Sequence, residues 1–286
     1  MKKKILISGA NGFIGSHFIK KKNKKYDFYG LINKNKKKIK GVKYIKIKNF
    51  YKKINKKIDI IIHLAQSKNY KKFPNKTKDI FNSNIKLTAE ILEFARINNV
   101  KKFIYLSSGS VYDVSKKSKI NEKTNFKFKN IDYYSASKIS SEFLIKSYQN
   151  FFDIVNLRIF FPYGKNQREN MLMSSLIKNV INNKKILIDN NLKFNPIYID
   201  DLVSSIEKSF KLKGLNEINI AGNEKTSIEK LIKIISKILN KKPLFKKISK
   251  KSDEFISENK IAKKKLFIPK ISITRGISNL LKKNNN

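Results

Sequence analysis

The first regular element predicted in this chain is Lys3-Lys4-Ile5-Leu6-Ile7-Ser8, and Gly9-Ala10-Asn11-Gly12-Phe13-Ile14-Gly15 follows it without a break. The first stretch predicts a short buried strand, and the second predicts a glycine turn that opens a helix over residues 13–21. Glycines allow a tight turn and let backbone N–H groups approach a pyrophosphate, which a helix N-terminus also attracts. The spacing differs from the usual Gly-x-Gly-x-x-Gly, and many strand–helix turns need glycine without binding a ligand. Its position directly after the first strand favours a dinucleotide-binding turn.

Predicted strands and helices alternate up to residue 160. Apolar runs predict strands at 26–32, 42–47, 58–64, 102–107 and 153–160, and helices at 79–98 and 133–149. This alternation predicts an α/β fold with a Rossmann-like, doubly wound parallel sheet. The later pattern is less regular, with helices expected at 171–181, 200–210 and 227–239 and short strands at 185–188 and 217–220. We therefore expect a dinucleotide-binding domain at 1–160 and a smaller, mixed substrate-binding region at 161–286, packed on the first domain rather than independent of it.

The formal net charge of +44 suggests a nucleic-acid partner at first sight. Arginine, which makes the forked contacts to base edges, occurs only at positions 96, 158, 168 and 275. The lysines are spread along the whole chain beside abundant asparagine and isoleucine, and these three residue types share A/T-rich codons. A biased genome therefore explains the charge. We expect weak polyanion binding at low salt and no specific nucleic-acid partner.

The composition also indicates which cellular compartment and which kinds of metal site to expect. The chain has no cysteine, which excludes disulfides and a thiolate zinc site. The apolar run after the first four residues is too short for a signal peptide, and no apolar stretch approaches the roughly 20 residues of a membrane-spanning helix. His17 and His63 are expected to be structural, and no metal-ligand cluster is visible. We expect a soluble, cytoplasmic protein without a metal or a membrane contact.

A candidate catalytic group lies in Tyr134-Ser135-Ala136-Ser137-Lys138. Residues four apart share a helix face, so Tyr134 and Lys138 can meet. An ammonium beside a phenol lowers the pKa of the phenol from about 10 towards neutral, which makes it a usable general acid or base. Ser108 ends a predicted strand, where open sheets bind ligands, and can hold the reacting oxygen. Among twelve tyrosines and so many lysines this spacing also fits a solvated pair, but its order after the glycine turn points to alcohol–ketone redox chemistry.

Further motifs follow in the same order. They are His63-Leu64-Ala65, Ser107-Ser108-Gly109-Ser110-Val111-Tyr112, Leu157-Arg158-Ile159-Phe160-Phe161-Pro162-Tyr163-Gly164, Asn195-Pro196-Ile197-Tyr198-Ile199-Asp200-Asp201 and Leu266-Phe267-Ile268-Pro269-Lys270. Over nearly its full length the sequence resembles the extended short-chain dehydrogenase/reductases, the NAD-dependent epimerase/dehydratase group that acts on nucleotide sugars. The resemblance implies NAD or NADP as the cofactor and a nucleotide sugar as the substrate. We also expect a homodimer.

The resemblance implies a role for each matching position. Tyr134 is the catalytic acid and base, Lys138 binds the nicotinamide ribose and lowers the pKa of the tyrosine, and Ser108 hydrogen-bonds the reacting oxygen. The cofactor-binding positions are Gly9, Asn11, Gly12, Phe13, Ile14, Gly15, Asn33, Lys34, Leu64, Ala65, Tyr134, Lys138 and Pro162. The substrate-binding positions are Ser108, Asn84, Phe161, Arg168 and Lys193.

Some positions depart from the family's pattern. Asn33 stands where many relatives carry an aspartate that binds the ribose 2′-hydroxyl, so NADP is tolerated and Lys34 favours it. Phe161 replaces a substrate-contacting asparagine. Gly109-Ser110 replaces the acidic pair that dehydratases use, which disfavours dehydration. The implied activity is epimerisation of a nucleotide sugar through a keto-sugar, with an NADPH-dependent keto-sugar reductase and a non-catalytic NAD(P)-binding scaffold as alternatives.

Overall fold

The computed structural model describes residues 1–33, 39–54, 56–114 and 119–282. They form two units, each with its own interior. The first unit contains Met1–Asp113, Asn125–Arg158 and Ile206–Ile218, and the second contains Val114–Thr124, Ile159–Ser205 and Asn219–Asn286. The domain division expected at residue 160 stays a prediction. The short segments Val114–Thr124 and Ile206–Ile218 each belong to the other unit from their neighbours in sequence.

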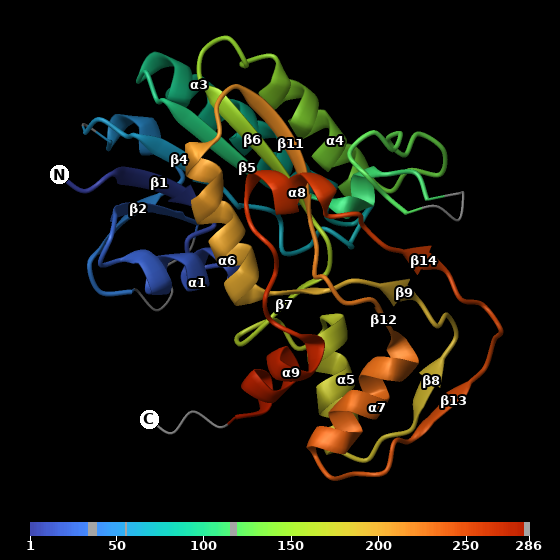
Figure 1. Ribbon diagram of the computed structural model, residues 1–286. Helices are drawn as coiled ribbons and strands as arrows, with labels where there is room; N and C mark the ends of the chain where they lie inside the picture. Colours follow the sequence, from blue (N-terminus) through green and yellow to red (C-terminus); the bar gives the residue numbers. More distant parts are fainter. Residues whose placement is uncertain (34–38, 55, 115–118, 283–286) are drawn as a thin grey trace. The chain divides into compact units, whose positions relative to one another are not determined.

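The first unit is built around a seven-stranded sheet (Figure 1). Its strands are β1 (Lys4–Ser8), β2 (Asp27–Ile32), β3 (Val42–Lys46), β4 (Ile60–His63), β5 (Lys102–Ser108), β6 (Asp153–Ile159) and β11 (Leu215–Ile220). Their spatial order is β11-β6-β5-β4-β1-β2-β3, and β1 pairs in parallel with both β2 and β4. Because the chain order reverses on either side of β1, the sheet is doubly wound, and the predicted Rossmann-like fold is confirmed.

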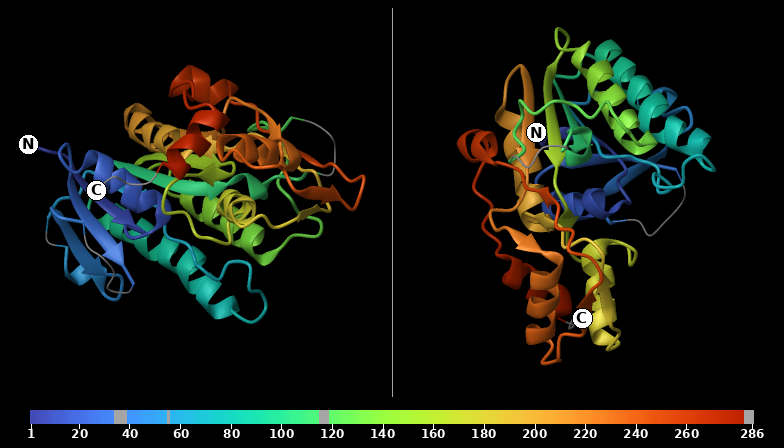
Figure 2. Two further views of the ribbon diagram at one scale, coloured as in Figure 1. Left: turned by 90° about the horizontal axis from the view of Figure 1, so that it is seen from below. Right: turned by 90° about the vertical axis from the view of Figure 1, so that its right-hand side faces the viewer.

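Burial explains why the central strands are continuous apolar runs. Ile5, Leu6 and Ile7 of β1 are fully buried, since a parallel sheet covered by helices hides both of its faces. Helix α1 (Phe13–Lys22) starts at the glycine turn. Helices α3 (Leu87–Ile97) and α4 (Tyr133–Lys146) lie side by side in the views of Figures 1 and 2.

The helix expected at 79–98 is interrupted. The chain instead forms α2 (Thr77–Phe81), a π-helical turn η2 (Asn82–Lys86) and then α3. A π-turn inserts one extra residue per turn and is frequent at functional sites. Three short 3₁₀ turns also occur in this unit, η1 (Phe50–Lys52), η3 (Gly109–Val111) and η4 (Ser209–Lys211).

The second unit is a mixture of helices and very short strands. Its elements are β7 (Pro162–Tyr163), α5 (Leu172–Ile181), β8 (Ile186–Ile188), β9 (Lys193–Phe194), β10 (Ile197–Tyr198), β12 (Thr226–Ser227), α7 (Ile228–Ile238), β13 (Phe245–Lys247), β14 (Glu254–Phe255), α8 (Lys260–Lys265) and α9 (Ile273–Leu281). Helix α6 (Ile199–Lys208) leads from this unit back into the first. The strands pair in three small sheets, β10-β7, β12-β9-β14 and β13-β8. Within the described ranges no helix is long and apolar enough to cross a membrane.

Candidate active site

The glycine turn after β1 is shaped by close backbone contacts. Gly9 has a φ of 69°, which favours glycine, and its carbonyl oxygen accepts a hydrogen bond of 2.8 Å from the Gly12 N–H. A Cβ atom on Gly12 would lie 3.0 Å from this carbonyl oxygen, and a Cβ atom on Gly15 only 2.4 Å from it. Gly15 therefore lets α1 pack against the turn, while Gly12 keeps the start of the helix open.

This turn fits a pyrophosphate. No side chain caps the N-terminus of α1, so the helix N-terminus is left for a ligand or solvent. Among the described residues, the side-chain nitrogen of Asn11 is buried and has no hydrogen-bond partner. A buried amide donor without an acceptor is unfavourable, and a phosphate oxygen would satisfy it. Phe13 and Ile14, the other two predicted positions, form the first turn of α1.

A buried chain of hydrogen bonds joins the ends of β1 and β4 to the π-turn. The Ser8 hydroxyl lies 2.6 Å from Nδ1 of His63, whose Nε2 lies 2.8 Å from the Thr88 hydroxyl. The Thr88 hydroxyl in turn donates to the carbonyl oxygen of Asn84 over 2.6 Å. The Ser8 oxygen accepts hydrogen bonds from the N–H groups of Leu64 and Ala65 at 3.0 and 3.1 Å.

The protons of this chain can be assigned by elimination. Thr88 has one hydroxyl proton and gives it to Asn84, so its oxygen must accept from His63. His63 is therefore protonated on Nε2, and Nδ1 accepts the proton of Ser8. Complete burial and the positive charge of Lys138 lower the pKa of His63 to about 3, which keeps the ring neutral. These hydrogen bonds fix the backbone of Leu64 and Ala65 beside the glycine turn. The two segments are so close that a Cβ atom on Gly9 would lie 3.0 Å from the backbone nitrogen of Ala65.

Tyr134, Ser108 and Lys138 come together at the end of β5. Tyr134 lies in the first turn of α4, which is capped by Asp132, and its phenol has the Ser108 side chain as a hydrogen-bond partner. The phenol also donates to Oε1 of Gln66 over a long 3.4 Å. Lys138 is buried one turn further on, and its Nζ donates to the Leu106 carbonyl oxygen over 2.8 Å.

The pKa values of the pair differ from the expectation. Burial raises the pKa of Tyr134 to about 12, against a smaller lowering by the hydrogen bond with Ser108. Burial also lowers the pKa of Lys138 to about 7, with Glu142 opposing the change. The lowered tyrosine pKa predicted from the Tyr-x-x-x-Lys spacing is wrong for this arrangement. The side-chain nitrogen of Lys138 donates to the Leu106 carbonyl oxygen, and burial of the phenol raises the pKa of Tyr134 instead of lowering it.

Asn84 is held inside the π-turn. Its side-chain oxygen accepts from the Ser67 N–H at 2.9 Å, and its side-chain nitrogen donates to the Ser137 hydroxyl at 2.8 Å. Its carbonyl oxygen also accepts from Ser141 at 2.8 Å. The residue is almost completely buried. In the structure Asn84 ties the π-turn to α4, while its predicted contact with substrate stays a prediction.

An ion pair in the interior fixes α4 against the sheet, and sequence reasoning did not identify it. Nη2 of Arg158 in β6 lies 2.7 Å from Oε2 of Glu142 in α4, and both side chains are almost fully buried. Arg158 also donates to the Tyr112 hydroxyl at 2.7 Å, and Ser107 donates to Glu142. Burial lowers the pKa of Arg158, but the hydrogen bond and the charge of Glu142 outweigh burial, so the pKa is raised above its usual value. Because breaking such a pair leaves a buried charge, it holds α4 and its tyrosine firmly in place.

The remaining predicted residues are spread over both units. Asn33 is exposed directly after β2, and Lys34 lies outside the described residues. Pro162, Phe161, Arg168 and Lys193 all belong to the second unit. Phe161 packs on Phe194 and Phe255, and Lys193 pairs with Glu254 at 3.0 Å.

Sequence reasoning missed two neighbours of Tyr134. Gln66 accepts its hydrogen bond, and the Tyr70 ring packs on the Tyr134 ring with the centroids 4.7 Å apart. Both belong to the segment between β4 and α2, which carries no motif that could have revealed them.

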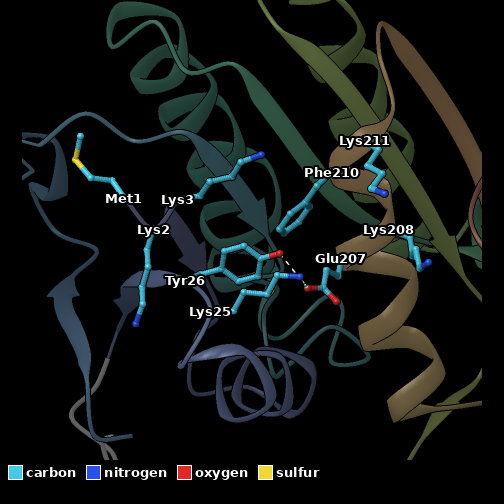
Figure 3. Close-up of a pocket in the computed structure, with 9 residues that line it drawn as sticks. All are labelled: Met1, Lys2, Lys3, Lys25, Tyr26, Glu207, Lys208, Phe210 and Lys211. Atoms are coloured by element: carbon cyan, nitrogen blue, oxygen red, sulfur yellow. Dashed lines mark hydrogen bonds and ion pairs between the residues drawn. The ribbon is translucent and has the colours of Figure 1, made fainter.

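A lysine-rich pocket of about 700 Å³ lies on the first unit (Figure 3). Its lining residues are Met1, Lys2, Lys3, Lys25, Tyr26, Glu207, Lys208, Phe210 and Lys211. Glu207 accepts hydrogen bonds from Lys22 at 2.6 Å, Lys25 at 2.8 Å and the Tyr26 hydroxyl at 2.9 Å. Of the predicted catalytic and cofactor-binding residues that the structure describes, none lines this pocket.

Comparison with known proteins identifies the family of the chain. The sequence pattern of the NAD dependent epimerase/dehydratase family matches residues 5–221. YtcB of Bacillus subtilis, called an uncharacterized UDP-glucose epimerase, is 29% identical over 265 residues that cover 84% of this chain and 83% of YtcB. A dTDP-D-glucose 4,6-dehydratase of Dictyostelium discoideum is 32% identical over 238 residues, 71% of this chain and 54% of that enzyme.

The chain can also be compared with a solved structure over nearly its full length. The UDP-glucuronic acid 4-epimerase of Bacillus cereus, crystallised in complex with NAD, is 28% identical to this chain. The two structures have a TM-score of 0.84, and the likeness covers 96% of each chain. The family pattern covers most of the chain, and the glycine turn, His63 and the Ser108–Tyr134–Lys138 group all fall within it. The chain therefore belongs to the NAD-dependent epimerase/dehydratase family, a branch of the extended short-chain dehydrogenase/reductases.

Proposed function

We propose that this protein is an NAD(P)-dependent epimerase of a nucleotide sugar. The observation that carries the proposal is the contact between Ser108 and Tyr134 at the carboxyl end of β5, one helical turn from the buried Lys138. Open α/β sheets bind their ligands at this end. The relatives with UDP-glucose or UDP-glucuronic acid in their names support a sugar linked to UDP as the first substrate class to test.

The residues divide the chemistry between them. Ser108 holds the reacting oxygen of the sugar, and Tyr134 exchanges a proton with that oxygen as a hydroxyl becomes a ketone and returns. The glycine turn and Asn11 would hold NAD(P), which would supply the hydride exchange when bound. Lys138 contributes positive charge and a ribose contact. Its pKa of about 7 means that the charge changes close to neutral pH.

Two alternatives share this machinery. A keto-sugar reductase uses the same half-reaction but consumes one reduced cofactor per turnover, and a scaffold protein binds the cofactor without turnover. Dehydration has less support, because Gly109 and Ser110 follow Ser108 where dehydratases carry an acidic pair. The homodimer and the cytoplasmic location predicted from the sequence stay predictions.

The test uses Tyr134→Phe against Tyr133→Phe. Both variants remove a phenol from the same turn of α4, but the Tyr133 ring stacks on Phe73 rather than meeting Ser108. The proteins are incubated with UDP-, GDP- and CDP-sugars and trace NAD(P), and the sugars are followed by NMR. We expect Tyr134→Phe to lose roughly two to four orders of magnitude in rate and Tyr133→Phe to stay within severalfold of the wild type. Cofactor binding without conversion of any sugar would instead support the scaffold.

A further inference from the structure

We propose that Tyr70 is a positioning residue for Tyr134. This inference rests on the proposed function and adds a residue that the sequence motifs do not contain. The two rings lie 4.7 Å apart at their centroids and are tilted by 51°. Aromatic pairs at this separation attract each other beyond the effect of burial alone.

Tyr134 gains from such support because few hydrogen bonds hold its hydroxyl. The side chain is partly buried, and the partners described for its hydroxyl are the Ser108 side chain and, over a long 3.4 Å, Oε1 of Gln66. A phenol that exchanges a proton must hold its oxygen within hydrogen-bond distance of the substrate, and small displacements reduce the rate strongly. A ring packed on the Tyr134 ring restricts its torsion angles without using the hydroxyl.

The segment that carries Tyr70 is itself anchored. The Ser67 N–H donates to the side-chain oxygen of Asn84, and the Ser67 hydroxyl donates to Asp79. The side-chain nitrogen of Asn69 donates to the same carboxylate at 3.1 Å. Tyr70 therefore follows a turn that is fixed to α2 and to the π-turn. The backbone of this turn holds the Tyr70 ring against the Tyr134 ring.

A second ring pair in the same segment provides a matched control. Phe73 stacks on Tyr133 with centroids 4.9 Å apart and an angle of 9°. Phe73→Leu thus removes an aromatic pair between the same segment and the same turn of α4, but it does not touch Tyr134. Tyr70→Leu removes the ring that packs on Tyr134, and Tyr70→Phe keeps that ring while removing its hydroxyl.

The experiment measures kcat and KM with UDP-glucose and with UDP-glucuronic acid, together with the ring resonances of Tyr134 in protein labelled with ¹³C-tyrosine. We expect Tyr70→Leu to lower kcat roughly tenfold with little change in KM, and to shift the Tyr134 resonances. Tyr70→Phe should restore both properties, and Phe73→Leu should alter neither.

The outcomes separate this inference from the proposed function. A wild-type kcat in Tyr70→Leu, unmoved Tyr134 resonances in that variant, or an equal loss in Phe73→Leu would overturn the role of Tyr70. If the wild type converts neither sugar, the UDP-sugar assignment fails, and the Tyr134 resonances alone then decide whether Tyr70 positions that ring.

Discussion

His63 connects three elements of the first unit through its two ring nitrogens. One nitrogen receives the proton of Ser8 at the end of β1, and the other donates to Thr88 in α3, while His63 itself ends β4. The sequence predicted a structural histidine. The side chain acts structurally here, but it does so at the place where Leu64 and Ala65 are held beside the glycine turn.

The neutral Nε2–H form of His63 can be observed directly. Its pKa is lowered to about 3 from the usual 6.5, so we expect no titration between pH 5 and 8 in ¹⁵N NMR spectra. In the unfolded chain His63 binds a proton below about pH 6.5, whereas in the folded chain it stays neutral down to about pH 3. The contribution of the neutral His63 to the stability of the fold is therefore complete above pH 6.5 and decreases as the pH falls towards 3. Since the chain has only two histidines, His17→Gln assigns the signals. Protonation near pH 6.5, or a proton on Nδ1, would contradict the network.

Gly12 tests the cofactor site. Gly12 has no side chain, and the space beside the Gly9 carbonyl oxygen stays open. A Cβ atom at this position would lie only 3.0 Å from that oxygen. We expect Gly12→Val to abolish binding of NAD(H) in calorimetric titrations, while Lys20→Val on the exposed face of the same helix leaves binding intact. Unchanged affinity in Gly12→Val would remove the turn from the cofactor site.

Among the elements, the buried strands were easier to predict from the sequence than the π-turn that interrupts the expected helix. The runs around Ile5–Ile7 and Ile60–Ile62 are apolar because both faces of the sheet are covered, and that signal is local. The π-turn at Asn82–Lys86 leaves no such signal, because it depends on hydrogen bonds that Asn84 makes with Ser67 and Ser137, far away in sequence. Tyr70 was missed for the same reason.

Glu207 offers a test of how α6 is joined to α1. Its carboxylate accepts hydrogen bonds from Lys22, the last residue of α1, and from Lys25 and Tyr26, which follow the helix. Despite partial burial, these donors lower the pKa of Glu207 to about 2 from the usual 4.5. The depressed pKa means that the stabilisation is present above pH 4.5 and is lost as the pH falls towards 2.

We expect Glu207→Gln to lower Tm by roughly 2–4 °C at pH 7, and by less at pH 3, in thermal unfolding followed by circular dichroism. Glu169→Gln is the control, because Glu169 pairs with Lys178 at 2.7 Å on the surface and exposed pairs contribute little. An equal effect of the two substitutions would show that the Glu207 cluster is an ordinary surface pair.

At the scale of the whole molecule, the order of the motifs supports the proposed function better than the net charge of +44 does. The glycine turn, His63-Leu64-Ala65, the Ser107–Tyr112 stretch and the Tyr134–Lys138 stretch each fall at the end of a strand or the start of a helix in the first unit. The irregular second unit was predicted less well. Its short strands depend on pairing between distant segments, such as Thr226–Ser227 with Lys193–Phe194.

The preference between the two nicotinamide cofactors is the next prediction. Asn33 is exposed after β2, where a carboxylate would repel a 2′-phosphate. We expect NADP(H) to bind at least as well as NAD(H) in calorimetric titrations, and Asn33→Asp to shift the preference towards NAD(H). A strong preference of the wild type for NAD(H) would contradict this role of Asn33.

Epimerisation itself is tested most directly by NMR of a UDP-sugar incubated in D₂O with a trace of NAD(P). We expect both epimers to appear while the cofactor stays catalytic in amount. We also expect the reacting carbon to keep its original hydrogen, because the hydride leaves and returns without exchange with solvent. Consumption of one cofactor per sugar, deuterium at the reacting carbon, or a 4-keto-6-deoxy product would contradict epimerisation.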